Sequence, residues 1–198
     1  MVLPMTEIDI HTQILEAAEV RFGQYGYNKT TMAEIARDCS MSAANLYRYF
    51  ENKLDIGAAL AQHCLVEKEQ LLRSVVDDDS LSSSEKLDAF IMSVLHHTYN
   101  HFDVSPKLGE LVEAMTVQRP DVVEQHRVSK LNLLAALLEK GKQAGDFKFD
   151  DVADTADAVH SAIMLFHFPL ALRMYPLEVL EEKAKNVVHL LLKGIETR

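Results

Sequence analysis

The amino-acid sequence predicts an all-α protein with an N-terminal three-helix domain of the helix-turn-helix type and a larger C-terminal helical domain. The composition favours helices over strands, since glycine occurs only seven times and proline five times in 198 residues that are rich in Ala, Leu, Glu and Lys. Apolar residues recur every three or four positions, which is the helical period. Residues that start or stop helices fall between these periodic segments. We place the domain boundary between residues 52 and 53, which gives domains of residues 1–52 and 53–198.

The first helix is expected over residues 7–24. Ile10, Ile14 and Phe22 share one face of it, because their spacing keeps the helical period. Gly26 follows as a stop signal, since glycine commonly ends a helix.

Two short helices follow, each with a recognisable start. Thr31 and Glu34 form a Thr-x-x-Glu capping box, in which the threonine oxygen accepts a backbone amide and the glutamate reaches back. The helix that they begin is expected to end near Cys39. Ser42 offers an N-cap oxygen to the next helix, which we expect to continue to Phe50.

The rest of the chain is predicted to form longer helices. Asn52 opens a helix that continues to about Val76, and the acidic, serine-rich residues 77–84 are expected to form a surface loop. Pro169 lies inside an otherwise helical stretch and is expected to kink or interrupt it. The later helices are expected over residues 85–102, 106–117, 120–144, 151–174 and 177–195, with Pro106, Pro120 and Pro176 at starts and Gly145 at an end.

The bulk composition excludes several classes of protein. No apolar stretch is long enough to span a bilayer, and the first ten residues lack the apolar run of a signal peptide, so we expect a cytoplasmic protein with no membrane partner. We expect Cys39 and Cys64 to be reduced, because secretory features are missing. The net charge of −10 is unusual for a nucleic-acid-binding protein. Between residues 21 and 53, however, five bases face three acids, so positive charge is concentrated there.

Residues 31–50 carry the pattern that points to function. Two short helices joined by a tight turn at Ser40 and Met41 make a helix-turn-helix. The outer face of the second helix carries small, amide, aromatic and cationic side chains, a combination that suits a helix in a DNA major groove. The alternative is an ordinary helical hairpin with a polar outer face. The inward set is Met32, Ile35, Ala36, Met41, Leu46 and Phe50, and the outward set is Ser42, Ala43, Ala44, Asn45, Tyr47, Arg48 and Tyr49.

The run from Phe22 to Ile56 resembles the N-terminal DNA-binding domain of the TetR family of repressors. That family shows a glycine before its second helix, a Thr-Thr or Thr-Ser start, and Ile-Ala inside that helix. Leu-Tyr-x-His/Tyr-Phe follows in the recognition helix, with a lysine shortly after it. The matching residues are Gly26, Thr30, Thr31, Ile35, Ala36, Leu46, Tyr47, Tyr49, Phe50 and Lys53.

The resemblance implies a role for each of these positions and for the rest of the chain. It implies a homodimer that binds a palindromic double-stranded DNA operator. It also implies a C-terminal domain for dimerisation and ligand binding, whose small-molecule effector moves the fourth helix and releases the DNA. Phosphates would be held by Thr31, Tyr47, Tyr49 and Lys53, and bases would be faced by Ser42, Ala43, Asn45 and Arg48.

Two positions depart from the family pattern. Ser40 stands where glycine is usual in the turn, and a left-handed conformation there costs a non-glycine residue about 1 kcal/mol. Ala44 stands where glycine is also frequent, and its methyl could contact a thymine methyl or limit the approach to DNA.

The last helix predicts a dimer surface. Its apolar stripe is wider than one neighbouring helix requires, which favours a four-helix interface with the preceding helix and a second copy of the chain. Burial within a single chain is the alternative. The residues expected in the interface are Val159, Leu170, Met174, Leu180, Val187 and Leu191.

Several histidines raise the possibility of a metal site. His97 and His101 share one helix face, and His126, His160 and His167 lie on other helices that could converge, as zinc or nickel ligands do. The alternative is a set of hydrogen-bonded or pocket-lining histidines. No carboxylate completes a recognisable motif, so we assign no metal ligand and no cofactor.

A second set of residues has the composition of a small-molecule pocket, which is mostly apolar with a few polar groups. Methionines among them would suit a largely apolar effector. Plain core packing is the alternative for each residue. The set comprises Met92, Leu95, His96, Tyr99, Met115, Leu134, Met164, Phe166 and His167.

Together these features predict a ligand-responsive transcriptional repressor and not an enzyme. A metal-responsive regulator using the histidines is one alternative, and a helical adaptor whose outward face binds protein is another. An all-α enzyme built on the histidines would lack a nucleophile, a phosphate loop and a glutamate beside paired histidines.

Overall fold

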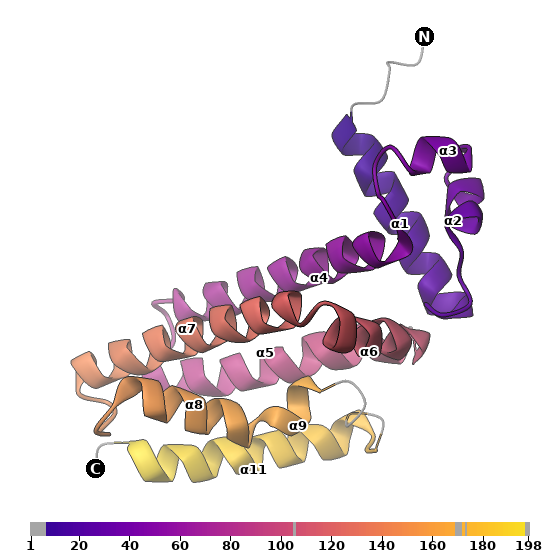
Figure 1. Ribbon diagram of the computed structural model, residues 1–198. Coiled ribbons are helices and arrows are strands. Elements are labelled where there is room, and N and C mark those ends of the chain that lie inside the picture. Colours follow the sequence, from indigo (N-terminus) through magenta and orange to yellow (C-terminus); the bar gives the residue numbers. More distant parts are fainter. Residues whose placement is uncertain (1–6, 105, 169–171, 173, 197–198) are drawn as a thin grey trace. The chain divides into compact units, whose positions relative to one another are not determined.

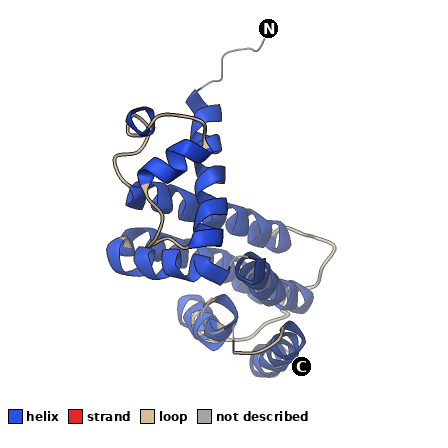
Figure 2. Cartoon of the chain, turned by 90° about the vertical axis from the view of Figure 1, so that its right-hand side faces the viewer, coloured by secondary structure: helices blue, strands red, loops and turns tan. Residues whose placement is uncertain are grey.

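The computed structural model describes residues 7–104, 106–168, 172 and 174–196. Over these residues the regular structure is helical, with one isolated antiparallel bridge between Phe147 and Glu196 (Figure 1 and Figure 2), so the all-α prediction is confirmed. None of the described helices is both long and apolar enough to cross a membrane. The elements are α1 (Glu7–Tyr25), α2 (Met32–Asp38), α3 (Ala43–Leu46), α4 (Lys53–Val76), α5 (Ser83–Val104), the 3-10 helix η1 (Pro106–Leu108), α6 (Gly109–Gln118), α7 (Pro120–Ala144), α8 (Val152–Ala162), α9 (Met164–His167) and α11 (Leu177–Ile195).

Most helix boundaries lie within a few residues of their predicted positions, because local signals fix them. Asn52 caps α4, since its Oδ1 accepts the Asp55 N–H at 3.0 Å. Pro120 is the first residue of α7. Gly145, which follows the last residue of α7, has a φ of +84°, the conformation that ends many helices.

Two of the predicted helices are shorter in the structure. α3 ends at Leu46 instead of Phe50, and turns continue the chain. The helix predicted over residues 151–174 divides into α8 and α9 at Ile163, whose side chain is completely buried. The helix therefore breaks at Ile163, where this side chain packs into the core, before the chain reaches Pro169. Pro169 itself lies outside the described residues.

The first compact unit contains residues up to 65 together with residues 104–123. α6 lies against α4 at Gly57, where an added Cβ would stand 2.8 Å from Leu111 Cδ1. A larger side chain at Gly57 would therefore require the Leu111 side chain to move. The fully buried residues of this unit include Ile14, Ala18, Phe22, Ile35, Leu46 and Ile56.

The second compact unit contains residues 66–103 and 124–198. Apolar side chains from the end of α4 and from α5, α7, α8, α9 and α11 form one continuous core. The boundary predicted between residues 52 and 53 lies within the first unit, so the functional division of the chain stays a prediction. Fully buried core residues of the second unit include Leu72, Phe90, Leu134, Ile163, Phe166 and Leu180.

Candidate functional site

Thr31 closes the start of α2 with the predicted capping box. Its Oγ1 accepts the Glu34 N–H at 3.3 Å, while Glu34 Oε2 accepts the Thr31 N–H at 2.9 Å and the Thr31 hydroxyl at 2.8 Å. These hydrogen bonds lower the pKa of Glu34. Thr31 remains exposed, so the residue that holds the helix start also faces solvent where a phosphate contact is expected.

Ser40 adopts the left-handed conformation in the turn between α2 and α3, with a φ of +56°. The Met41 N–H donates to the Ala36 carbonyl at 2.9 Å, and the Ser40 N–H donates to the Arg37 carbonyl at 3.0 Å. This hydrogen-bond pattern ends helices at a left-handed residue. The conformation expected from the family's glycine is therefore present, and the serine side chain bears its steric cost.

The predicted outward residues lie on and just after α3, which is anchored from beneath. Ser42 caps α3, with its Oγ accepting the Asn45 N–H at 3.2 Å, and Leu46 is completely buried. Tyr47 and Arg48 are exposed, and Asn45 is partly exposed. Leu46 thus fixes the helix while hydroxyl, amide and guanidinium groups remain accessible on it and next to it.

Tyr49 is positioned by packing against α1. Its ring lies edge-on to His11, with centroids 5.6 Å apart and an interplanar angle of 83°. The His11 ring also contacts the Phe50 ring, at 4.8 Å between centroids. Tyr49 is therefore partly buried, whereas Tyr47 is 54% exposed.

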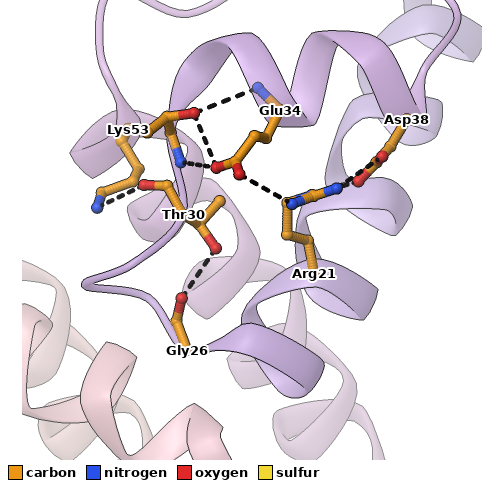
Figure 3. Close-up of polar contacts among 7 residues, drawn as sticks. Arg21, Gly26, Thr30, Glu34, Asp38 and Lys53 are labelled. Atoms are coloured by element: carbon orange, nitrogen blue, oxygen red, sulfur yellow. Dashed lines mark hydrogen bonds and ion pairs between the residues drawn. The ribbon is translucent and has the colours of Figure 1, made fainter.

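Arg21 is engaged in an internal ion-pair network, which reduces the positive charge available to a ligand. Figure 3 shows its guanidinium between Glu34 and Asp38. Nη2 donates to Asp38 Oδ1 at 2.9 Å, Nε also donates to Asp38, and Nη1 lies 3.5 Å from Glu34 Oε1. The hydrogen bond to Arg21 lowers the pKa of Asp38. The exposed cations of the segment are Lys29, Arg37 and Arg48.

Lys53 reaches back to the loop that precedes α2. Its Nζ donates to the Thr30 carbonyl at 2.9 Å (Figure 3). It also donates to the carbonyls of Tyr27 at 2.7 Å and Asn28 at 3.4 Å. The ammonium also lies 4.4 Å from the centroid of the Tyr27 ring, and burial lowers the Lys53 pKa. The predicted phosphate contact would require Lys53 to share these carbonyl contacts.

Two residues near the start of α6 contact the end of α1 and the loop before α2, and the sequence carries no signal for either. Glu110 Oε2 accepts the Asn28 N–H at 2.9 Å, and Lys107 Nζ donates to the Gln24 carbonyl at 2.7 Å. A Cβ on Gly26 would stand 2.7 Å from the Glu110 carboxylate oxygens. Gly26, with a φ of +93°, therefore serves both the turn and the close approach of Glu110.

The residues predicted to line a ligand pocket are divided between the two units. Met115 lies in the first unit, with its methyl close to Gly57, whereas the other eight belong to the second unit. Leu95, Leu134 and Phe166 have almost no exposed surface, which is the core packing considered as their alternative.

The remaining predicted ligand residues lie nearer the surface of the second unit. His96 Nε2 lies 2.7 Å from Glu181 Oε1, so α5 and α11 are linked at this point. Met164 is exposed, and its Sδ lies 3.4 Å from His167 Nε2. The partly buried residues at the edge of the core are Met92 and Tyr99.

His126, His160 and His167 approach one another as the sequence suggested, but two lysines lie among them. The rings of His160 and His167 have centroids 4.7 Å apart, and Lys130 Nζ lies 2.6 Å from His167 Nδ1. Burial, followed by the charges of Lys130 and Lys68, lowers the pKa values of His126 and His167. Ammonium groups repel a metal cation, so this arrangement favours a different ligand chemistry. Sequence reasoning missed both lysines, because neither stands in a recognisable motif.

Val159 and Leu180, predicted in a dimer interface, are buried inside the chain's own second unit. Burial within one chain, the alternative considered above, applies to these two residues because their side chains offer no surface to a partner. Leu170 lies outside the described residues.

Other apolar residues near and on α11 remain accessible. Met174 is 69% exposed, and Val187 and Leu191 are partly exposed. Leu190, which the prediction did not include, is 71% exposed. Single exposed apolar side chains are ordinary on protein surfaces, so they indicate a contact with another molecule only where they form a patch.

Family models and solved structures share this organisation. Residues 14–60 match the model for bacterial regulatory proteins of the tetR family, and residues 83–188, more than half of the chain, match the model for the tetracyclin repressor-like C-terminal domain. The uncharacterized HTH-type transcriptional regulator YhgD of Bacillus subtilis (strain 168) is 27% identical over 149 residues, which cover 75% of this chain and 78% of that protein.

The structural likenesses extend over nearly the whole chain. A transcriptional regulator from Cytophaga hutchinsonii ATCC 33406 gives a TM-score of 0.74 at 22% identity, covering 94% of this chain and 98% of its own. The regulator FadR from Bacillus subtilis, in complex with stearoyl-CoA, gives 0.70 at 21% identity, covering 94% and 100%. At these identities the likenesses establish the fold.

Proposed function

The chain belongs to the TetR family of bacterial regulatory proteins, and from this premise we propose that it is a ligand-responsive repressor that binds a palindromic operator as a homodimer and is released by a small, largely apolar effector. Members of the family are DNA-binding transcriptional regulators and not enzymes. The observation that carries the proposal is the accessible outer face of α3 and the residues just after it, held by the left-handed turn at Ser40 and the Ser42 cap.

The DNA contacts divide into two classes by chemistry. Tyr47 and Arg48 project from the end of α3, where a phenol can hold a phosphate and a guanidinium can read a guanine edge. The exposed residues of α3 and of the turn after it carry little positive charge. The affinity for DNA should therefore come from the docking of two copies of the chain as well as from contacts between cations and phosphates. The proposed phosphate contacts are Thr31, Tyr47, Tyr49 and Lys53, and the proposed base contacts are Ser42, Ala43, Asn45 and Arg48.

The proposed dimer uses the accessible apolar side chains of the second unit. Leu190 and Met174 are the most exposed of these, and Val187 and Leu191 lie beside Leu190 on α11. Covering these side chains with a second copy would remove apolar surface from water. Two-fold symmetry then places two α3 helices on successive major grooves of a palindrome, about one helical turn apart.

The proposed effector response uses the position of α6 in the chain. α6 packs within the first unit, while the helices on either side of it, α5 and α7, lie mainly in the second unit. A ligand that prefers one arrangement of α5 and α7 would therefore act on the Glu110 and Lys107 contacts through a short connection. FadR of Bacillus subtilis is described with stearoyl-CoA, so a related fold accommodates an effector with a long apolar part.

Selection from randomised double-stranded DNA tests this function. The full-length protein is expected to retain a palindrome, with binding that weakens steeply as salt increases. Tyr47→Ala should weaken binding about tenfold or more, whereas Tyr25→Ala should not. Tyr25 is a matched control because it is 52% exposed, close to the 54% of Tyr47, but lies outside the proposed surface. Retention of no specific sequence, or equal effects of the two substitutions, would contradict the proposal.

A further inference from the structure

The second unit contains a buried cluster of basic side chains contributed by five helices. We call it the basic cluster. Both of its lysines and one of its histidines are more than nine-tenths buried: Lys130 is 4% exposed, and Lys68 and His160 are each 6% exposed. Buried lysines are rare unless something compensates their charge. The full set is Lys68 on α4, His97 on α5, His126 and Lys130 on α7, His160 on α8 and His167 on α9.

Three members of the basic cluster, Lys130, His160 and His167, form a chain of direct contacts. Lys130 Nζ lies 2.6 Å from His167 Nδ1, and the His167 ring meets the His160 ring edge-on, with centroids 4.7 Å apart. Lys68 Nζ donates to Thr98 Oγ1 at 2.6 Å. Base therefore faces base at the centre of the cluster, where an uncharged core would ordinarily place apolar side chains.

Acidic groups stand at the margin of the cluster. Glu69 Oε1 is 3.7 Å from His126 Nδ1, which is beyond hydrogen-bond distance. Glu67 and Asp157 are exposed residues, and their charges only partly oppose the lowering of the His97 and His160 pKa values, respectively. Among the charges that act on Lys130, the neighbours that shift its pKa are the cations Lys68 and Arg127.

The electrostatic consequence is that positive charge is suppressed inside the cluster. Burial, followed by the neighbouring cations, lowers the Lys130 pKa to about 7. Burial likewise lowers the pKa values of His126 to about 3, His160 to about 4 and His167 to about 2. An anion placed here would reverse these shifts, because it favours the charged form of each base.

Two buried ring nitrogens also lack hydrogen-bond partners among the described residues. They are His126 Nδ1 and His160 Nδ1. Buried polar atoms in folded proteins are nearly always satisfied, so each such atom requires a partner from outside the chain or a functional explanation. His160 supplies this atom from a side chain that is more than nine-tenths buried.

We propose that the basic cluster binds the carboxylate of the effector, and that the effector is a small organic acid with an apolar body. The Lys130 ammonium would pair with the carboxylate, and His160 would donate a hydrogen bond from Nδ1 to one of its oxygens. This proposal rests on the proposed effector response and specifies its chemistry. It extends the assignment of His167 as a ligand residue and replaces the metal alternative.

The surroundings of the cluster explain the apolar body. Three apolar residues stand about one helical turn from polar residues in or beside the cluster: Val94 from Thr98, Leu134 from Lys130, and Ile163 from His160. All three are completely or almost completely buried in the core. A ligand whose acid meets the basic cluster would therefore meet apolar side chains next to it.

Calorimetric titration of the full-length protein tests the proposal without DNA. The probes are hexanoate, octanoate and benzoate, each compared with its primary amide, which has the same body but no charge. At least one carboxylate is expected to bind about tenfold or more tightly than its amide, the factor expected from a charge-assisted hydrogen bond. If none does, or if inorganic phosphate binds in preference to all three carboxylates, the proposal is wrong.

Variants then locate the binding. Lys130→Met is expected to abolish the preference for carboxylate over amide, and His160→Phe, which keeps an aromatic ring without Nδ1, is expected to reduce it several-fold. Lys86→Met is the matched control, because Lys86 is a buried lysine of the same unit that contacts the Val76 carbonyl outside the cluster. Circular dichroism shows which variants fold. If Lys130→Met does not fold, the titration of His160→Phe decides whether the basic cluster is the site.

The outcomes separate this proposal from the proposed function. Unchanged carboxylate preference in both cluster variants would refute the basic cluster as the site, even if the protein binds a palindrome. Failure to bind DNA would instead refute the repressor function and leave a positive carboxylate titration intact.

Discussion

The Asn28 N–H donates to the side chain of Glu110, a residue 82 positions further along the chain, at 2.9 Å. Asn28 lies in the loop before α2, and Glu110 lies in the first turn of α6. The contact therefore joins the loop that precedes the helix-turn-helix to the segment that connects α5 with α7. Gly26 makes the contact possible, because a side chain at Gly26 would occupy the space of the carboxylate.

Glu110→Ala is expected to reduce the effect of an effector on DNA binding. The substitution leaves the Asn28 N–H to water and loosens α6 from the loop, so a shift of α6 would displace the proposed DNA contacts less. The ratio of operator affinities without and with effector measures the change. Glu113→Ala on the same helix is the control, since Glu113 is exposed. Equal ratios for wild type and Glu110→Ala would rule out a role for this contact in the response.

Ser40→Gly is expected to stabilise the first unit by about 0.5–1 kcal/mol, because glycine adopts a positive φ without steric cost. Ser40→Ala keeps the strained Cβ and should not stabilise the protein. Urea denaturation of both variants measures the difference in the free energy of unfolding. A glycine variant no more stable than the alanine variant would show that Ser40 is not strained in solution.

Lys53→Met is expected to destabilise the protein by about 1–3 kcal/mol, since three backbone carbonyls lose their shared donor. Lys29→Met, at an exposed lysine, should leave stability nearly unchanged. Thermal unfolding distinguishes the two variants. If Lys53→Met keeps full stability and only lowers the salt dependence of DNA binding, Lys53 acts as a phosphate contact alone.

Lys130→Met is expected to raise the free energy of unfolding at neutral pH by on the order of 1–4 kcal/mol, because it removes a buried charge. The folded pKa of about 7 is below the ordinary value of 10.5, so the unfolded chain binds the extra proton between these values. The contribution of Lys130 therefore makes the wild type more stable as pH rises above about 7, and the advantage of the variant shrinks over the same range.

Urea denaturation of both proteins from about pH 6.5 to about pH 8.5 measures this difference. This range avoids the titration of Tyr27 and most of that of Cys39, whose pKa values burial raises. A constant difference between wild type and variant across the range would mean that Lys130 keeps its ordinary pKa. The groups that act on Lys130 or share its cluster are Lys68, His97, His126, Arg127, His160 and His167.

The basic cluster also shows how far sequence patterns carry a site prediction. The spacing of histidines indicated that His126, His160 and His167 could converge, and His160 and His167 do meet. Lys130 and Lys68 were not foreseen, because a lysine on a helix gives no sign of being buried. These two lysines disfavour the metal alternative and favour an anionic group on the effector.

The sequence by itself determined the features that depend on neighbours within a few residues. The Thr31 capping box and the Ser42 cap follow from local hydrogen bonding, and the left-handed turn at Ser40 was implied by the resemblance to the TetR family; the structure has each of them. The tertiary structure alone decided which side chains lie together across long separations, such as Glu110 with Asn28 and Lys130 with His167. It also decided that Val159 and Leu180 are core residues. The physical reason is that an apolar or amphipathic stripe shows which side of a helix avoids water, but only packing decides what covers it.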